Sequence, residues 1–273
     1  GVFEGKLVTV FHGYDISSYL RKHGNAVYNS LFMRGDMFLP ISERWKNRLI
    51  ELGCSEQKIV VHRMGIDTSK FCYLPRKPGK DGKVRLLTIA RLIEKKGVQY
   101  AVQAVADVLK RYSNIEYNIV GDGPVKNTLE DLIEGLNIGN NVKLFGWRQQ
   151  EEIIELMKHT DILIAPSVVS EDGDEEGIPV VLMEALAQGM PVLSTQHSGI
   201  PEVVEDGKSG FLVPERDVDA LAEKLVFFIE HPDSWTKMGQ AGREYVEKCY
   251  NIDKLNNRLI EIYQLLLSET LGA

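Results

Sequence analysis

The chain has 273 residues, of which 44% are hydrophobic and 26% are charged, and its formal net charge is −7. This composition is typical of globular proteins, and the length suffices for one large domain or two modest ones. The scattered cysteines Cys54, Cys72 and Cys249 lack metal-ligand spacing, and no apolar run approaches the ~18 to 20 residues that cross a bilayer. We therefore expect neither a disulfide framework, a zinc site nor a membrane-spanning helix, and we expect the protein in the cytoplasm.

The basic and acidic side chains are unevenly distributed along the chain. Residues 1–80 hold 13 Lys and Arg against 7 Asp and Glu, whereas residues 81–273 hold 19 against 32. A chance distribution of solvated charges is the simpler interpretation. The alternative is that the basic segment contacts anionic lipid at the inner face of the membrane, or a phosphorylated acceptor, while the acidic remainder excludes nucleic acid as a partner.

The first 74 residues show the pattern of an incomplete α/β domain. Strands are predicted at residues 7–11, 37–41 and 59–63, and an amphipathic helix at 43–52. These strands are too few for the usual doubly wound sheet of about six. The first residues also lack an initiator Met and a signal-peptide layout, so we expect residues 1–74 to be the later part of a domain whose beginning is missing.

Residues 75–82 are rich in Pro, Gly and Lys and lack periodicity, so they are predicted to be a linker. In residues 83–250, apolar strands alternate with helices, which predicts one complete parallel sheet with helices on both faces. The predicted strands are residues 84–90, 116–121, 142–145, 161–166, 191–195 and 210–213, and the predicted helices are residues 98–111, 125–136, 150–159, 179–188 and 217–230. A last amphipathic helix is predicted at 252–269, and we expect residues 251–273 to pack back across both domains.

The strongest motif consists of Glu176 and Glu184, which are separated by seven residues. Pro179 suits the first turn of a helix, where its missing N–H has no partner, and Gly189 is placed to end that helix. Glu184 then lies about 8 Å along the helix from its first residue. This distance is comparable to that from a donor sugar across a diphosphate to a ribose. One carboxylate can meet the sugar and the other the ribose, while the diphosphate faces the free N–H groups of the segment Gly177, Ile178, Pro179 and Val180. Incidental acids on a surface helix are the alternative.

A diphosphate bound without a metal needs fixed cations, and Arg91 and Lys96 follow the strand at residues 84–90. Ligands of open parallel sheets sit at the carboxyl ends of the strands, so both side chains are expected to point into a cleft. Lys96 is preferred to Lys95 because the next residue, Gly97, lets the backbone approach closely. A solvated basic turn is the alternative.

These motifs together resemble the retaining glycosyltransferases of family 4. The resemblance is carried by Arg91…Lys96-Gly97, Gly121-Asp122-Gly123-Pro124, Pro166-Ser167, Glu176…Glu184 and Gly199-Ile200-Pro201-Glu202. Within that family, residues 11–18, 63–67 and 167–202 are similar to the bacterial glycosyltransferases of colanic acid biosynthesis. The likeness covers essentially the whole chain.

The resemblance implies an α/β protein of the GT-B fold, with one complete Rossmann-like donor domain and a partial Rossmann-like acceptor domain. It implies that Arg91 and Lys96 hold the donor diphosphate and that Glu184 holds the ribose. Glu176 would contact the transferred sugar, with retention of configuration and without a metal or another cofactor. His12 matches the family histidine that approaches the sugar from across the cleft, although a lone His after a strand is more often structural.

The implied reaction is transfer of a hexose from a nucleotide-diphosphate sugar to a growing, lipid-linked exopolysaccharide unit. Two other functions stay open: a noncatalytic fragment that binds nucleotide sugar, and a nucleotide-sugar epimerase of the same fold, which would be expected to lack the paired Glu176 and Glu184. Because the acceptor domain lacks its first strands, we expect this chain to bind the donor, to transfer little or no sugar, and to self-associate through its open sheet edge.

Three further motifs imitate ligand sites. Asp172-Gly173-Asp174 imitates a manganese site, but it adjoins Glu176 and we predict no metal there. Gly207-Lys208-Ser209 imitates a phosphate-binding loop, but the required earlier glycine is absent and a strand is predicted directly after it. Gly121-Asp122-Gly123 is interpreted as a tight turn after a strand.

Overall fold

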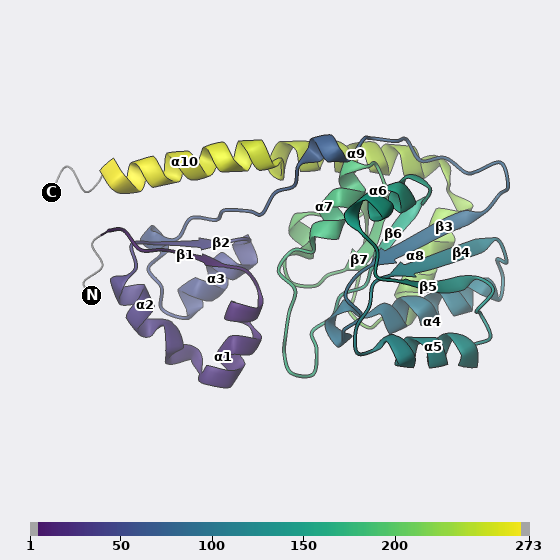
Figure 1. Cartoon of the computed structure of the whole chain (residues 1–273), viewed down its shortest axis with the longest axis horizontal. Coiled ribbons are helices and arrows are strands. Elements are labelled where there is room, and N and C mark those ends of the chain that lie inside the picture. Colours follow the sequence, from purple (N-terminus) through teal and green to yellow (C-terminus); the bar gives the residue numbers. More distant parts are fainter. Residues whose placement is uncertain (1–4, 269–273) are drawn as a thin grey trace.

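The computed structural model describes residues 5–268 and contains two parallel sheets (Figure 1). The larger sheet has six strands in the order β5-β4-β3-β6-β7-β8. Their bounds are β3 Val84–Ile89, β4 Ile115–Val120, β5 Val142–Gly146, β6 Ile162–Ala165, β7 Val192–Thr195 and β8 Gly210–Val213. The chain moves outward from β3 to β5, returns to the middle, and moves outward again from β6 to β8. This arrangement confirms the predicted doubly wound α/β domain.

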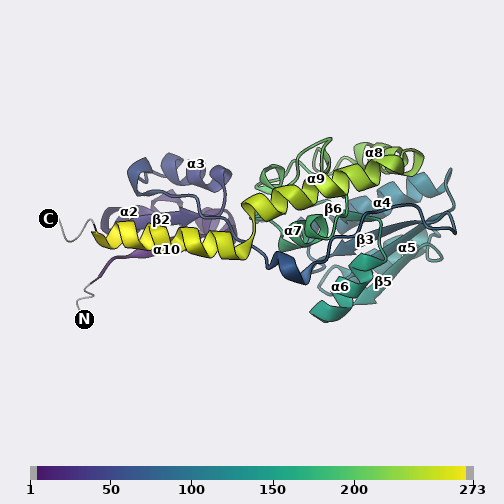
Figure 2. The same ribbon diagram turned by 90° about the horizontal axis from the view of Figure 1, so that it is seen from above.

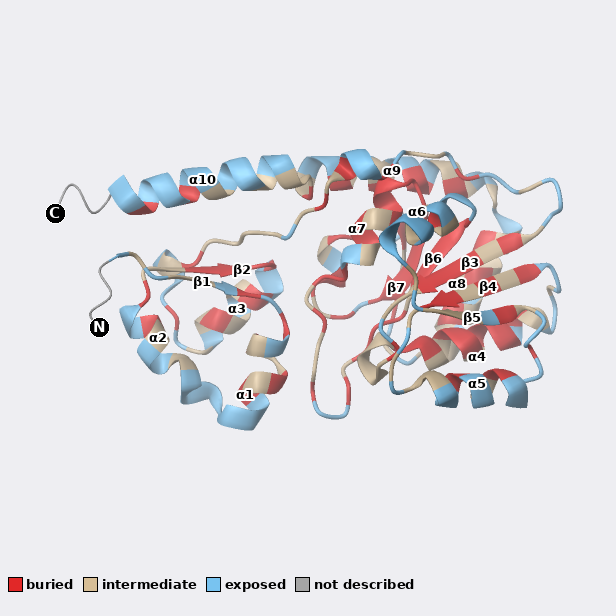
Figure 3. Cartoon of the chain, in the orientation of Figure 1, coloured by how far each residue is buried: buried red, intermediate tan, exposed pale blue. Residues whose placement is uncertain are grey.

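Helices cover both faces of the six-stranded sheet because its strands are apolar on both faces. In β3, Leu86 packs against the helices of one face and Leu87 against those of the other, as the alternation along a strand requires. The first face carries α4 Val98–Leu109, α5 Lys126–Gly135 and α8 Val218–Glu230. The second carries α6 Gln150–Lys158, α7 Val180–Ala187 and α9 Asp233–Cys249. Figure 3 shows the buried strands between these two layers.

The smaller sheet consists of β1 Val8–Phe11 and β2 Met37–Pro40, which pair in parallel. The strand predicted at residues 59–63 is only partly formed: Ile59 makes a single bridge to Phe38, and the N–H groups of Val60 and His62 donate to β2 carbonyls at 3.0 Å each. The next bridge would need an N–H on Pro40, which proline lacks, so the ladder cannot continue.

Around the small sheet lie α1 Ser18–His23, α2 Asn29–Arg34 and α3 Glu43–Glu51, with the 3-10 turns η1 Tyr14–Ile16, η2 Asn25–Tyr28, η3 Glu56–Lys58 and η4 Thr68–Lys70. Aromatic rings fill much of this core, and Phe11 meets Tyr28 edge to face at 5.3 Å between ring centroids. Among the described residues β1 pairs only with β2, and Val10 is 42% exposed. The outer edge of β1 is therefore an open sheet edge.

Arg76 fixes residues 75–82, which are predicted to be a linker, to two helices that pack on the larger sheet. Its guanidinium is buried and donates to the carbonyls of Met157, Lys158 and Thr160 at the end of α6, and to that of Gln188 at the end of α7. Burial lowers the pKa of Arg76 to about 10, so the side chain remains a cation at neutral pH. This cation gives the carbonyls at these helix C-termini a charged hydrogen-bond donor.

The chain ends with α9 and then α10 Ile252–Ser268. The sequence reasoning did not predict α9, which contains Gly239 and Gly242. A Cβ on Gly239 would lie 2.0 Å from the carbonyl oxygen of Gly189. The glycine therefore lets α9 pack closely against the end of α7. The start of α10 is tied to Ile66, which bonds Tyr250 and Ile252 through the backbone. From there α10 extends over the smaller sheet in Figures 1 and 2, and the predicted residues 269–273 lie outside the described chain. No helix within residues 5–268 is long and apolar enough to cross a membrane.

Candidate active site

The loops that carry Arg91, Lys96 and Glu176 begin at the point where the strand order of the large sheet reverses. β3 and β6 are neighbours there, and the chain leaves them in opposite directions. Loops at such a switch point form a crevice at the carboxyl ends of the strands. In Figure 1 these ends face the smaller sheet. The loop after β3 carries Arg91 and Lys96, and the loop after β6 carries Glu176.

The two loops touch at Gly97, whose φ is 61°. A Cβ on Gly97 would lie 2.0 Å from the carbonyl oxygen of Pro166, so only glycine permits this approach. Beside it, the N–H of Val168 donates to the carbonyl of Lys95 at 2.8 Å. The predicted close approach of the backbone at Gly97 is thus present, and it brings both lysines to the loop that carries Glu176.

Glu176 is 8% exposed and faces two lysines. Lys96 Nζ lies 3.0 Å from its Oε1 and Lys95 Nζ lies 3.7 Å from the same atom. Oε1 nevertheless has no hydrogen-bond partner among the described residues, so the contact with Lys96 is an ion pair outside hydrogen-bond geometry. Lys95, which the sequence reasoning set aside, also pairs with Asp174 at 2.7 Å. Both lysines therefore belong to this site.

Glu184 lies in α7, which begins at Val180, with Pro179 just before it as the N-cap residue. Its side chain is half-buried, and burial raises the pKa of its carboxyl group above the usual value. No side chain or backbone group within residues 5–268 makes a hydrogen bond or ion pair with it. A carboxylate held away from water without a partner is suited to accept hydrogen bonds from the hydroxyl groups of a ligand.

Two predicted residues have exposed side chains. Arg91 lies in the turn after β3 and makes no ion pair with a described residue, so its guanidinium is free to meet an anion. His12 follows β1, and its backbone N–H donates to both oxygens of Asp15, at 3.1 and 3.0 Å. Within residues 5–268 neither side chain has a hydrogen-bond or ion-pair partner, and the backbone of His12 borders the loop of Glu176.

The two halves of the chain meet next to Glu176 through glycines. A Cβ on Gly13 would lie 3.0 Å from the nitrogen of Gly177, and a Cβ on Gly177 would lie 3.1 Å from the carbonyl oxygen of His12. The loop after β1 therefore packs backbone to backbone against the loop of Glu176. This contact places His12 beside the paired-glutamate motif, although the two are far apart in sequence.

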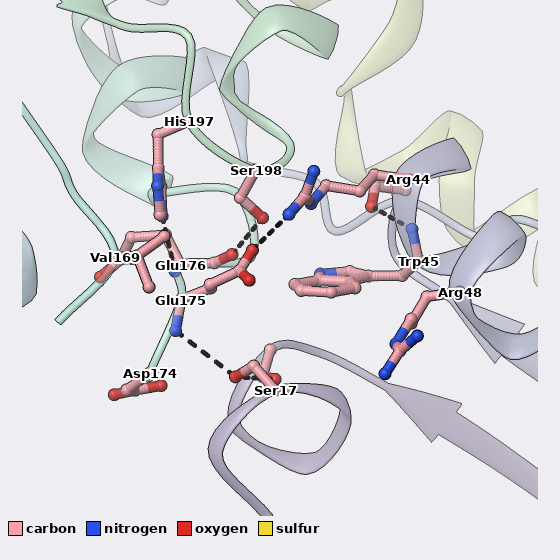
Figure 4. Close-up of polar contacts among 12 residues, drawn as sticks. Ser17, Arg44, Trp45, Arg48, Val169, Asp174, Glu175, Glu176, His197 and Ser198 are labelled. Carbon is pink, nitrogen blue, oxygen red and sulfur yellow. Dashed lines mark hydrogen bonds and ion pairs between the residues drawn. The ribbon is translucent and has the colours of Figure 1, made fainter. Parts of the chain in front are cut away.

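A polar cavity of about 770 Å³ lies beside this contact. Its walls come from α1, α3 and the loops that hold Glu175 and Ser198. Arg44 of α3 reaches across it to Glu175 at 2.6 Å, as Figure 4 shows. The cavity opens between the two halves of the chain. One of its lining residues, Glu175, directly precedes Glu176 in the sequence.

The three motifs that imitate ligand sites make the following contacts in the structure. In Asp172-Gly173-Asp174, Asp172 accepts from Ser170 and Asp174 faces Lys95, and no group of metal-ligating side chains is found within residues 5–268. Gly207-Lys208-Ser209 leads directly into β8, as predicted. Gly121-Asp122-Gly123 is predicted to be a tight turn, but the turn lies at residues 124–125, and Gly121 instead packs closely against the loop after β3, where a Cβ would lie 1.8 Å from the carbonyl oxygen of Ala90.

Sequence reasoning missed one group of the site. His197 and Ser198 follow β7: His197 accepts from the backbone N–H of Glu176, and Ser198 donates to its backbone carbonyl, as Figure 4 shows. For these two residues, the only signal in the sequence is the similarity of residues 167–202 to the colanic acid glycosyltransferases. A buried contact between residues 21 positions apart has no periodicity by which a sequence could reveal it.

Comparisons with known proteins agree with this architecture. The profile of the Glycosyl transferases group 1 family matches residues 74–245. Over 268 residues the chain is 42% identical to the putative colanic acid biosynthesis glycosyltransferase WcaL of Escherichia coli (strain K12), covering 97% of this chain and 66% of that protein. Over 266 residues it is 40% identical to the amylovoran biosynthesis glycosyltransferase AmsK of Erwinia amylovora, covering 97% and 65%.

Solved structures share the fold across both sheets. A glycosyltransferase from Rickettsia africae ESF-5 matches with a TM-score of 0.81 and 25% identity, covering 97% of this chain and 72% of that one. Anabaena HepE in complex with UDP matches with a TM-score of 0.81 and 20% identity, covering 95% and 72%. The chain spans slightly less than two thirds of the length of the two curated relatives above.

Proposed function

Because the chain belongs to the Glycosyl transferases group 1 family, we propose that it binds a nucleotide-diphosphate sugar and transfers the hexose, with retention of configuration, to a growing lipid-linked exopolysaccharide unit. The observation that carries this proposal is the pair of carboxylates around the start of α7. Glu176 is buried beside two lysines, and the half-buried side chain of Glu184 has no partner among residues 5–268. The names of the colanic acid and amylovoran relatives support the exopolysaccharide product.

The donor is proposed to lie along the start of α7. The ribose hydroxyl groups would donate hydrogen bonds to the carboxylate of Glu184, for which the described part of the chain offers no partner. The diphosphate would lie between Arg91 and Lys96, facing the free N–H groups at the start of the helix. The sugar would then reach Glu176, at the end nearest the other half of the chain.

In the transfer step the bond between the anomeric carbon and the diphosphate oxygen breaks, and a bond from the acceptor oxygen forms on the same face of the sugar. In the same step the acceptor hydroxyl passes its proton to the departing diphosphate oxygen, which lies on the same face of the sugar. Negative charge develops on the departing diphosphate, and the fixed cations Arg91 and Lys96 would stabilise it without rearranging. These cations and the helix start take the part that a metal plays in other transferases, so no metal is proposed.

The acceptor is proposed to bind in the cavity between α1 and α3. Its walls carry Ser17, Asn25 and Asn47, which suit saccharide hydroxyls, and it lies one residue from Glu176. His12 borders the same region on the loop after β1. Because the acceptor half brings basic side chains, we also propose a peripheral contact with anionic lipid at the cytoplasmic face of the membrane.

A second candidate function is binding of nucleotide sugar without turnover. It is favoured by one observation: among the described residues β1 pairs only with β2, which leaves the outer edge of β1 open. In that case the open edge of β1 would pair with a second copy of the chain.

The experiment that separates the two functions is calorimetric titration with UDP, GDP and ADP, followed by donor turnover assays with and without chelator. A transferase should bind one of these nucleotides and release it from the matching nucleotide sugar, at the same rate with chelator present. Binding without release would favour the second function. No binding of any of the three would contradict both.

A further inference from the structure

The peptide groups around Glu176 are held by three consecutive residues after β7. The N–H of Glu176 donates to Nε2 of His197 at 3.0 Å, and the hydroxyl of Ser198 donates to the carbonyl of Glu176 at 2.5 Å. The N–H of Gly199 donates to the carbonyl of Gly177 at 3.3 Å. Figure 4 shows His197 and Ser198 on either side of this peptide.

These contacts determine the protonation of His197. A backbone N–H can only donate, so Nε2 must be the unprotonated, accepting nitrogen. The ring proton is then on Nδ1, which donates to Oε1 of Glu215 at 2.6 Å. The ring is completely buried, and a second proton on Nε2 would oppose the N–H of Glu176. His197 is therefore neutral in this arrangement, with one nitrogen for each partner.

Glu215 and Arg216 also fix the beginning of the loop that carries Glu176. We call these contacts, together with those of His197 and Ser198, the anchor of the loop. Oε2 of Glu215 accepts from the N–H of Val169 at 2.8 Å, and Arg216 donates to the carbonyl of Val169. The loop from Val169 to Glu176 is thus fastened at both ends to residues that follow β7 and β8. Its carboxylates are carried on a segment with fixed ends.

Backbone strain occurs at the same residues. Ser198 has a φ of 48° and Arg216 a φ of 62°, in the left-handed region that residues with a side chain avoid. Such conformations persist where surrounding contacts over-determine them, and they gather at functional sites. Here both strained residues supply a hydrogen bond to the loop that carries Glu176.

We propose that His197 is a positioning residue for Glu176, held in its Nδ1–H form by Glu215. This inference rests on the proposed function, in which Glu176 contacts the donor sugar. The carboxylate of Glu176 has ion pairs but no hydrogen bond from a described residue. Apart from these ion pairs with Lys95 and Lys96, the position of the carboxylate depends on the backbone that His197 and Ser198 hold.

Two substitutions separate the two hydrogen bonds of His197, one with the N–H of Glu176 and the other with the carboxylate of Glu215. In His197→Gln, the side-chain oxygen takes the place of Nε2 and still accepts from the N–H of Glu176. In His197→Asn, the side-chain amide takes the place of Nδ1 and keeps the bond to Glu215, but Glu176 loses its acceptor. His159→Gln is the matched control, because His159 forms an exposed pair with Glu155 at 3.1 Å on α6.

Three measurements on the full chain test the proposal: imidazole nitrogen NMR, hydrogen exchange at the amide of Glu176, and UDP binding together with turnover of UDP-glucose. We expect the wild-type ring to be protonated on Nδ1 alone, and the amide of Glu176 to be protected in the wild type and His197→Gln but not in His197→Asn. His197→Asn should lower the turnover rate by about tenfold or more, the size expected when a buried donor loses its acceptor, with UDP affinity unchanged. His197→Gln should retain most of the rate, and His159→Gln all of it.

The proposal is overturned if the ring carries its proton on Nε2, if His197→Asn is as active as His197→Gln, or if UDP affinity falls in parallel with the rate, as general unfolding would cause. Failure of the proposed function looks different. If the wild-type chain neither binds UDP nor turns over UDP-glucose, the transferase proposal fails for these compounds, while the NMR and exchange results still support or overturn the anchor itself.

Discussion

Glu202, in the loop after β7, caps the helix that starts at Glu43 in the other half of the chain. Its two carboxylate oxygens accept from the backbone N–H groups of Glu43 and Arg44, both at 3.1 Å. The guanidinium of Arg63 lies 3.4 Å from the same carboxylate. An acidic cap at a helix N-terminus satisfies otherwise unpaired N–H groups and interacts favourably with the helix dipole. One side chain thus links the two halves next to the proposed cleft.

We expect Glu202→Ala to lower the free energy of unfolding by about 1 to 2 kcal/mol, because two helix N–H groups lose their acceptor. The change should weaken the contact between the halves, which limited proteolysis between them would report. Chemical denaturation gives the stability. Glu223→Ala, which removes an exposed carboxylate of α8, is the control and should change neither result.

Arg76→Met is expected to destabilise the protein by about 3 kcal/mol or more, because the carbonyls at the ends of α6 and α7 lose a buried cationic donor. Arg111→Met is the matched control, since Arg111 is largely exposed beside Glu230. Equal unfolding midpoints for the two variants would show that Arg76 does not anchor residues 75–82.

Glu184→Gln is expected to stabilise the unliganded protein at neutral pH while weakening nucleotide binding. Burial raises the folded-state pKa of Glu184 above its ordinary value of 4.5, so the folded state holds this proton more tightly than the unfolded state. The cost of ionisation is absent below the unfolded pKa, grows as pH rises toward the folded pKa, and is fully present above it. Unfolding of both proteins across that pH range checks this: their stability difference should shrink toward acidic pH. A difference that grows toward acidic pH would contradict the burial argument.

Arg91→Ala and Lys96→Ala should each weaken binding of the nucleoside diphosphate about ten- to a hundredfold, since a charged hydrogen bond contributes about 1.5 to 3 kcal/mol. Lys95→Ala tests the other lysine. Because Lys95 also faces Asp174, we expect a smaller loss of nucleotide affinity than for Lys96→Ala. Titration calorimetry with and without chelator decides this, and unchanged affinity in both the Arg91 and Lys96 variants would remove the diphosphate assignment.

The sequence predicted the large sheet well because its strands are buried on both faces and alternate with helices of clear period. The resemblance to the colanic acid glycosyltransferases is confirmed by the relatives. The predicted strand at residues 59–63 failed as a regular strand for a reason visible only after pairing: its neighbour offers Pro40 where an N–H is needed. The helix α9 was missed because its glycines, which lower helix propensity, serve a close approach to α7.

Within the site, residues next to a strand end or a helix start were within reach of sequence reasoning, since topology brings those ends together. The structure brings Lys96 to Glu176 at the switch point and places Glu184 in α7, and the ligand roles of all three stay predictions. The preference for Lys96 over Lys95 missed the ion pair between Lys95 and Asp174, because that pair depends on how the loop at Asp174 folds. The links from Glu176 to His197 and from α3 to Glu202 join different loops, and no spacing along the chain encodes them.

The measurement that tests the central proposal most directly compares Glu176→Gln with Glu184→Gln in titrations with a nucleoside diphosphate and with its sugar conjugate. We predict that Glu184→Gln weakens binding of both ligands by a similar factor, because the ribose is common to them. Glu176→Gln should bind the free nucleotide as the wild type does, yet lose the preference among sugar conjugates and the release of nucleotide from them. If both variants bind the nucleotide and discriminate between sugars as the wild type does, the two carboxylates do not hold the ends of a sugar donor.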